Sequence, residues 1–302
     1  MLITLLLVFS LCKIGLLIIL LFFNILNDFE RNIRMIKDLF SIFKDVLTNK
    51  KLLMQFSYND FRSRYASSTL GIFWAFVNPI VTVLTYWFVF DVGLKSGLTD
   101  GKYPFICYLL TGIVPWFYFS DVLGSATNVF REYSYLVKKV VFNIRILPTS
   151  KLISNLYMHI FFLAIAFLVT ILNGFMPSVQ TLQIIYYGFC MMMFLTGLTW
   201  ITASIQPFFP DINQFIGVIM QTLMWGSPVL WSVSAFPPVV QTILKLNPLF
   251  YVIQGYRNAF FSEGWFWQHP ALSIYFWVWT LALLLIGSVV FKRLKPHFSD
   301  VL

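Results

Sequence analysis

Six long apolar stretches, separated by short polar or basic segments, constrain the fold of this chain more than any other feature. Each stretch has about the 20 residues that a helix needs to cross a bilayer. Only 11% of the residues are charged, whereas a soluble domain is about 25% charged. The pattern excludes a water-soluble fold and predicts an all-α polytopic membrane protein with six core transmembrane helices. These spans are expected near residues 70–93, 104–124, 152–172, 182–205, 213–231 and 272–291.

Most of the positive charges lie on one side of the predicted membrane spans. Of the 21 Lys and Arg residues, sixteen lie in residues 31–64, 131–151 and 292–295, which are all on the same side of the predicted spans. Cytoplasmic segments are the ones enriched in Lys and Arg. The pattern therefore predicts a cytoplasmic C-terminus in a cytoplasmic (inner) membrane. It also explains the net charge of +9 without a nucleic-acid partner.

Two segments precede the first predicted span. Residues 1–27 are apolar but lack the basic start and small-residue cleavage site of a signal peptide. They are interpreted either as a real extra helix or as sequence upstream of a mis-assigned start.

Residues 28–69 combine mixed charge with apolar residues at helical spacing, which predicts an amphipathic helix in the headgroup plane. Its apolar face is expected to contain Leu39, Phe40, Phe43, Val46 and Leu47.

The last connection, residues 232–270, is too polar to span a membrane and too apolar for a free loop. Pro237-Pro238 can start one short helix, and Asn247-Pro248 can end it and start another. Two such helices predict a re-entrant hairpin at the outer face. Backbone of this kind is tolerated at membrane depth only beside protein or a water-filled cavity, so it indicates a conduit.

No catalytic or cofactor motif is visible. The string nearest to a phosphate-binding loop, residues 97–103, is one residue short and lacks the Ser or Thr. The three histidines, His159, His269 and His297, are too dispersed for a metal site. Asp121 lies within a span, and a structural role near the inner end of that span is favoured over a functional one. The chain is therefore predicted to be no enzyme and to hold neither cofactor nor metal.

Seven short motifs follow one another between about residue 36 and the C-terminus. The first reads RSRYASSTLGIFWAFVNP and the last LKPHFSD; the seven occupy residues 62–79, 115–119, 136–148, 210–212, 227–229, 247–257 and 294–300. In this order they resemble the permeases of polysaccharide-export ABC transporters, which include O-antigen, capsule and wall teichoic acid exporters. Residues 86–90 and 175–178 are similar to teichoic acid exporters more than to O-antigen exporters.

This resemblance implies a homodimeric permease, with residues 70–302 as the six-span domain. It implies a separate ATPase in two copies that binds Mg-ATP, and a lipid-linked polysaccharide as substrate. The cytoplasmic loop resembles the helix that couples to the ATPase, with Lys138, Lys139, Phe142, Arg145 and Pro148 as its candidate residues. The family commonly has Pro and an acid where this chain has Asn143 and Arg145, so the contact is expected to differ in detail.

Three further groups of residues are candidates for handling the substrate. Arg62, Arg64 and Tyr65 at the junction with the first span would form the substrate entrance, since guanidinium groups suit a diphosphate. Anchoring of the topology is an equal alternative for the two arginines. Aromatic faces let sugars slide, which makes Trp74, Tyr86, Trp116, Phe119 and Trp225 candidates for the translocation path. Tyr256 and Arg257 in the hairpin are candidates for an outer gate.

Two other functions fit parts of the pattern. One is an ABC-type exporter of small hydrophobic molecules or lipids, which would need a short apolar pocket. The other is an integral membrane glycosyl- or acyltransferase, which would need paired carboxylates or a His–Asp arrangement at one face.

Overall fold

A computed structural model describes residues 39–41, 44–64, 69–93, 102–138 and 143–302. Within those ranges the regular elements are all helices. The interpretation of residues 1–27, Tyr65 of the entrance, and Lys139 and Phe142 of the coupling loop lie outside the described residues. The all-α polytopic fold is confirmed.

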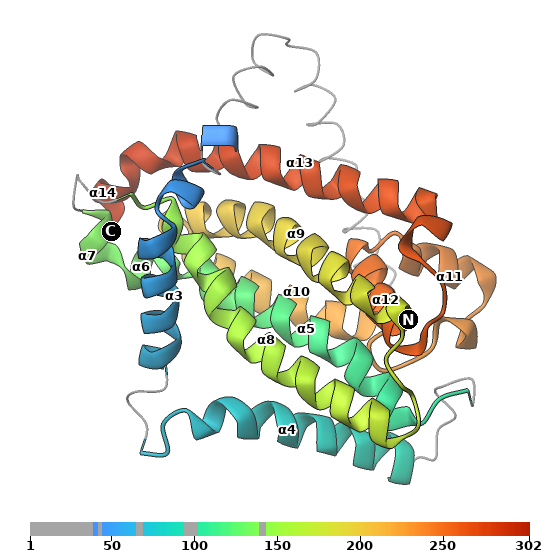
Figure 1. The fold of residues 1–302 in the computed structure, drawn as a ribbon. Helices are drawn as coiled ribbons and strands as arrows, with labels where there is room; N and C mark the ends of the chain where they lie inside the picture. Colours follow the sequence, from blue (N-terminus) through green and yellow to red (C-terminus); the bar gives the residue numbers. More distant parts are fainter. Residues whose placement is uncertain (1–38, 42–43, 65–68, 94–101, 139–142) are drawn as a thin grey trace.

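Four long helices run side by side and form the body of the molecule (Figure 1). They are α5 (Phe105–Thr127), α8 (Ile146–Leu172), α9 (Gln183–Ile205) and α13 (Pro270–Leu294). With α4 (Phe73–Trp87) and the π-helical turn Phe88–Gly93 that continues it, five described helical segments are long and apolar enough to cross a membrane. These five coincide with predicted spans.

Glycines allow the closest helix pair to form. A Cβ atom at Gly197 of α9 would lie 2.6 Å from the backbone nitrogen of Leu284 in α13. A Cβ atom at Gly287 of α13 would lie 2.7 Å from the carbonyl oxygen of Gly197. The absence of side chains at these two positions therefore brings the backbones of α9 and α13 into direct contact.

The remaining predicted span, residues 213–231, corresponds to a shorter helix than expected. Helix α10 (Ile212–Gly226) has 15 residues, about 22 Å of helix against the roughly 30 Å of a hydrocarbon core. It ends at Ser227, whose extended backbone (ψ 150°) is the conformation that the following Pro228 favours. The next residues, 227–230, turn into the protein and are buried.

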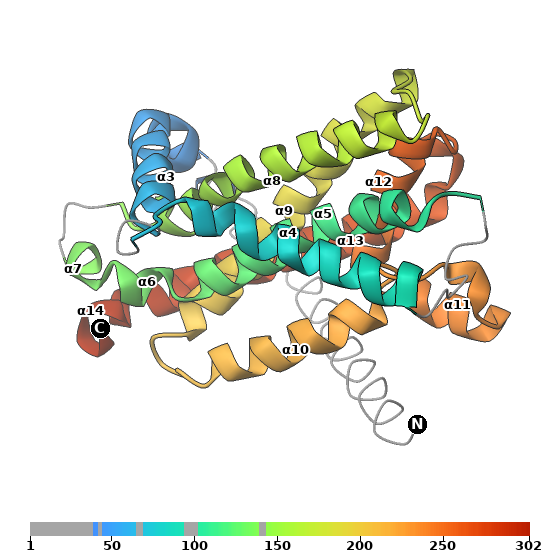
Figure 2. The ribbon, with the colours of Figure 1, turned by 90° about the horizontal axis from the view of Figure 1, so that it is seen from below.

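Helix α3 (Lys50–Arg64) lies across one end of the bundle, at a steep angle to α8 (Figures 1 and 2). The interfacial position of residues 28–69 in a bilayer stays a prediction. The buried face of α3 consists of Leu53, Ser57 and Asp60, so two of the three buried residues are polar. Helix α3 therefore contacts the bundle mainly through polar side chains.

The predicted breaks of the outer connection are confirmed. Helix α11 (Pro238–Lys245) and helix α12 (Pro248–Phe261) begin at the expected prolines. The Asn247 side chain caps α12 by accepting a hydrogen bond from the backbone N–H of Leu249 (3.0 Å). Helix α12 is buried against α5 and α9, whereas α11 has no buried residue. The depth of this hairpin in a bilayer stays a prediction.

Short elements complete the described part of the chain. They are α6 (Val129–Glu132), α7 (Ser134–Val137), the 3-10 turns Val179–Leu182, Val233–Ala235, Phe266–Gln268 and Lys295–His297, and α14 (Phe298–Val301).

Candidate functional site

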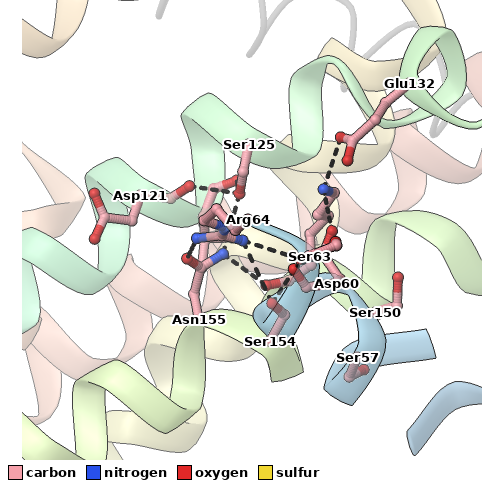
Figure 3. Close-up of polar contacts among 12 residues, drawn as sticks. Ser57, Asp60, Ser63, Arg64, Asp121, Ser125, Glu132, Ser150, Ser154 and Asn155 are labelled. Atoms are coloured by element: carbon pink, nitrogen blue, oxygen red, sulfur yellow. Dashed lines mark hydrogen bonds and ion pairs between the residues drawn. The ribbon is translucent and has the colours of Figure 1, made fainter. Parts of the chain in front are cut away.

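A buried ionic cluster joins α3 to the bundle (Figure 3). The Asp60 carboxylate forms an ion pair with Lys151 of α8, and both side chains are almost fully buried (2% and 3% exposed). Asp60 also accepts hydrogen bonds from Ser154 Oγ (2.6 Å) and from the Tyr133 hydroxyl (3.1 Å). Its two oxygens are thus occupied by groups from α8 and from the loop that contains α6 and α7.

Lys151 extends this cluster to the loop that contains α6 and α7. Its Nζ atom lies 2.7 Å from Glu132 Oε2 at the end of α6. The same ammonium group lies 5.4 Å from the centre of the Tyr133 ring. One buried lysine therefore links α3, a membrane span and the loop between the second and third predicted spans.

Arg64 forms the other side of the cluster. Its Nη2 atom contacts Asp60 Oδ2 at 3.0 Å, and its Nη1 atom donates to Asn155 Oδ1 at 2.6 Å. Asn155 in turn donates to Ser125 Oγ of α5 at 3.0 Å. The network thereby reaches α5, and α3 is fixed to two membrane spans.

Burial and charge act in opposite directions on Asp60. Burial by itself would raise the pKa of this carboxyl, but Lys151, Ser154 and Arg64 together hold the pKa below its ordinary value. Asp60 is therefore ionised at neutral pH, and the cluster contains a compensated buried charge. Breaking such a pair from one side is costly, because the remaining charge stays buried without its partner.

A pocket of about 370 Å³ opens beside this cluster. The residues that line it are all polar or charged: Asp60, Ser63, Arg64, Ser125, Asn128, Glu132 and Lys151. The pocket lies at the end of the bundle where α3, α5, α6 and α8 meet. Such a site is suited to a hydrated or hydroxyl-rich group.

The predicted entrance residues differ in their surroundings. Arg64 lines the pocket and is held by Asp60 and Asn155, while Arg62 is exposed on the opposite face of α3. Sequence reasoning missed Asp60, Glu132 and Lys151. The spacing of Asp60 and Arg64, four residues apart on one helix, could have indicated a pair. Its partners on α8 and α6 could not be found, because they are distant in sequence.

The predicted path residues fall into two groups. Trp116 and Phe119 are buried inside the protomer (6% and 2% exposed) and contact each other, with ring centres 5.7 Å apart. Trp74 on α4 and Trp225 on α10 are exposed (42% and 55%). Tyr86 is half-buried on α4. The structure thus does not bring the five aromatic residues together on one surface of the protomer.

The predicted outer gate lies in the protein interior. Arg257 is 1% exposed, donates to the carbonyl oxygen of Val229 (2.8 Å), and lies 3.6 Å from the centre of the Tyr108 ring. The Tyr256 hydroxyl pairs with His159 Nε2 at 2.9 Å. Both residues join α12 to neighbouring segments, and Arg257 fixes the non-helical turn that follows α10.

The coupling candidates are also divided. Lys138 is exposed at the end of α7. Arg145 pairs with Asp45 and donates to Ser41 Oγ (3.0 Å), so it contacts the segment before α3. Pro148 is buried in the first turn of α8. Within the described part of the chain, no group of three or more His, Cys, Asp or Glu side chains is arranged to hold a metal ion.

The fold and the site together define a polytopic helical membrane protein in which α3 is fixed to the bundle by buried charges. The family model for ABC-2 type transporters matches residues 52–261. The chain therefore belongs to the ABC-2 type transporter family, and it is a multi-pass membrane permease of a system that works with an ABC ATPase.

Curated relatives extend over most of the sequence. The chain is 23% identical to the O-antigen export system permease protein RfbA of Myxococcus xanthus over 270 residues, which are 89% of this chain and 99% of the relative. A protein of the same name from Klebsiella pneumoniae is 23% identical over 83% of this chain and 95% of its own length. The polysialic acid transport protein KpsM of Escherichia coli is 21% identical over 77% of this chain and 89% of its own length.

Proposed function

We propose that this chain is the membrane-spanning permease subunit of an ABC transporter that exports a lipid-linked polysaccharide across the bacterial cytoplasmic membrane. The observation that carries the proposal is the match to O-antigen export permeases along 83–89% of the chain. ATP hydrolysis, with Mg-ATP as its cofactor, takes place on a separate subunit in two copies. The C-terminus lies on the cytoplasmic side, together with α3 and α6.

Entry of the substrate is assigned to the pocket beneath α3. Arg64 lines it and would present a pre-positioned guanidinium group to a diphosphate head, while Arg62, exposed on the opposite face of α3, would attract that head from outside the pocket. The polar lining would accept the first sugars while the lipid tail stays in the membrane. Tyr65 completes the entrance in the proposal.

Coupling is assigned to the cytoplasmic loop and its ionic link to α3. A displacement of α6 and α7 by the ATPase would act on Glu132, and through Lys151 on Asp60. Because packed charges have few alternative arrangements, such a link transmits rigid-body movement. Replacement of Lys138 and Lys139 by Glu is expected to weaken association with the ATPase without unfolding the permease. Unchanged association would contradict this role.

In the proposed homodimer, the second copy of the chain packs against the exposed surfaces of α4 and α10. Helix α4 buries only Ala75 and Val83, and α10 buries only Ile212, Ile216 and Met224. Trp74 and Trp225 are exposed on these helices. In the homodimer these surfaces would enclose the translocation path, because a single bundle of this size leaves little room for a glycan.

Co-purification tests the proposal. The tagged chain, extracted from its native membrane, should bring down an ABC ATPase, and ATP hydrolysis by the pair should rise with a lipid-diphosphate-linked glycan. Stimulation by small lipophiles alone would instead support the exporter of hydrophobic molecules. A chain that purifies alone and without ATPase activity would contradict the proposal.

A further inference from the structure

One side of α5 is polar and open at its cytoplasmic half. The residues of this polar stripe follow one another at helical spacing and are all exposed or half-buried: Ser120, Asp121, Gly124, Ser125 and Asn128. The rest of this half of α5, by contrast, is buried in the protein core. A Cβ atom built on Gly124 meets nothing within 4 Å, so the stripe borders open space.

The stripe continues the pocket beneath α3 into the membrane. Ser125 and Asn128 belong to the pocket lining, and Asp121 lies one to two helical turns further along α5. Figure 3 shows the Asp121 carboxylate pointing away from the ionic cluster. Within the described part of the chain this carboxylate has neither a hydrogen-bond partner nor an ion-pair partner.

Helix α10 also exposes amide side chains, on the side turned away from its buried residues Ile212 and Ile216. Its first turn is joined to the stripe by a hydrogen bond from Asn213 Nδ2 to Asn128 Oδ1 (2.8 Å). Gln214 and Gln221, seven residues apart and therefore on one face of α10, are both exposed. A Cβ atom on Gly217 between them also meets nothing within 4 Å.

A lipid-facing position does not suit these groups. A charged side chain within a span is costly in hydrocarbon and is expected to face protein or water. An unpaired carboxylate, two hydroxyls and several amides on surfaces next to a polar pocket therefore indicate a hydrated path. Carboxylates accept hydrogen bonds only, whereas hydroxyls and amides both donate and accept. That set of groups is complementary to the hydroxyls of a sugar chain.

The charges beside this path disfavour a polyanion. Lys151 and Arg64 are each paired with Asp60, and Lys151 is also paired with Glu132. Two positive and two negative side chains in the pocket therefore cancel. Asp121 adds one unpaired negative charge, and in a confined path this charge repels a nearby negative charge more strongly than it would in bulk water.

We propose that the polar stripe of α5 forms the glycan-contacting wall of the inner path, and that Asp121 selects polymers whose repeat units carry no negative charge. This inference rests on the proposed function and narrows its substrate class. The single diphosphate of the lipid anchor is bound at Arg64 of α3, at the pocket end of the stripe and away from Asp121. A teichoic-acid-type polymer, with a phosphate in each repeat, is disfavoured.

The test uses the complete complex of permease and ATPase in lipid nanodiscs. Two probes of equal length are compared: a lipid-diphosphate-linked uncharged glycan, and the same glycan with one phosphodiester in each repeat. We expect the uncharged probe to stimulate ATP hydrolysis at about tenfold lower concentration. Asp121→Asn should bring the two concentrations close together, whereas Asp300→Asn, an exposed acid in α14, should leave the ratio unchanged.

The outcomes separate the two proposals. If both probes act equally on the native complex, or if Asp121→Asn leaves the preference intact, the substrate class is refuted while the export function stands. If neither probe stimulates hydrolysis, the proposed function itself fails.

A labelling experiment checks the placement of the stripe without any substitution of Asp121. After replacement of the three native cysteines by Ala, Gly124→Cys in the assembled complex should react with a membrane-impermeant, charged thiol reagent. The uncharged probe should slow this reaction several-fold. Leu281→Cys, at a surface position of α13 (50% exposed), should stay unreactive as the lipid-facing control. If Gly124→Cys is as unreactive as the control, the stripe faces lipid and the inference is wrong.

Discussion

Replacement of Lys151 by Met removes the central cation of the buried cluster while keeping most of the side-chain volume. Asp60 would keep Arg64, Ser154 and Tyr133 but would lose its buried ion pair, and Glu132 would lose its partner. Loss of one partner from a buried pair costs roughly 3–5 kcal/mol. Because Asp60 retains Arg64 at 3.0 Å and other donors, we expect a loss of stability near the lower limit, about 3 kcal/mol.

The measurement is thermal unfolding of the purified chain in detergent, followed by tryptophan fluorescence. The Tm of Lys151→Met should fall by several degrees, whereas Lys138→Met, at an exposed position outside the cluster, should be unchanged. The double variant with Asp60→Leu removes both charges of the pair. Its loss should be smaller than the sum of the two single losses by at least about 1 kcal/mol, since contacting residues couple. Additive losses, or a Tm for Lys151→Met equal to that of the control, would refute the argument that these charges fix α3.

Three more predictions follow from the same structure. Stability from Asp60, whose pKa is held below the ordinary value of 3.8, should be present above that pH and be lost as the pH falls through the lower folded pKa; in Lys151→Met this loss should be smaller and should end at a higher pH, because the folded pKa is then less depressed. Gly197→Ala should lower Tm strongly, because the new Cβ atom would lie 2.6 Å from the backbone of α13. Gly217→Ala, with open space around the new Cβ atom, should leave Tm unchanged or raise it slightly. Equal effects of the two substitutions on Tm would contradict the close packing of α9 and α13. Arg145→Ala removes the pairing with Asp45 and Ser41 and should increase the rate of proteolysis or hydrogen exchange in the segment before α3. Unchanged rates would show that this contact does not stabilise the segment.

The candidate site was only partly predictable. The sequence makes Arg64 a candidate for the substrate entrance, with anchoring of the topology as an equal alternative, and the structure places it in the pocket lining. Lys151, by contrast, could be counted only as one of several topogenic charges. Its burial under α3 depends on a residue 91 positions earlier, Asp60, and no local pattern encodes that pairing. Likewise Asp121 was assigned a structural role, and only the exposed surface of α5 showed an unpaired carboxylate.

The sequence also does not distinguish buried from exposed aromatic residues. Trp116 and Trp225 are both tryptophans in apolar segments, and composition alone gave them the same assignment. Their exposed fractions, 6% and 55%, depend on the neighbours that each helix meets. Arg257 shows the same limit: beside a predicted outer loop its sequence suggests a surface charge, but α12 carries it into the interior beside Tyr108.

The sequence by itself determined the membrane class, the positions of the long spans, the helix breaks at Pro238 and Pro248, and the family. These properties follow from local quantities: hydrophobic length against bilayer thickness, the distribution of Lys and Arg, and the missing N–H of proline. The tertiary structure alone decided which charges are paired, which face of α5 is open, and how α3 is attached. Those features depend on contacts between segments far apart in the chain, where the free energy of a charge is set by its neighbours rather than by its own residue type.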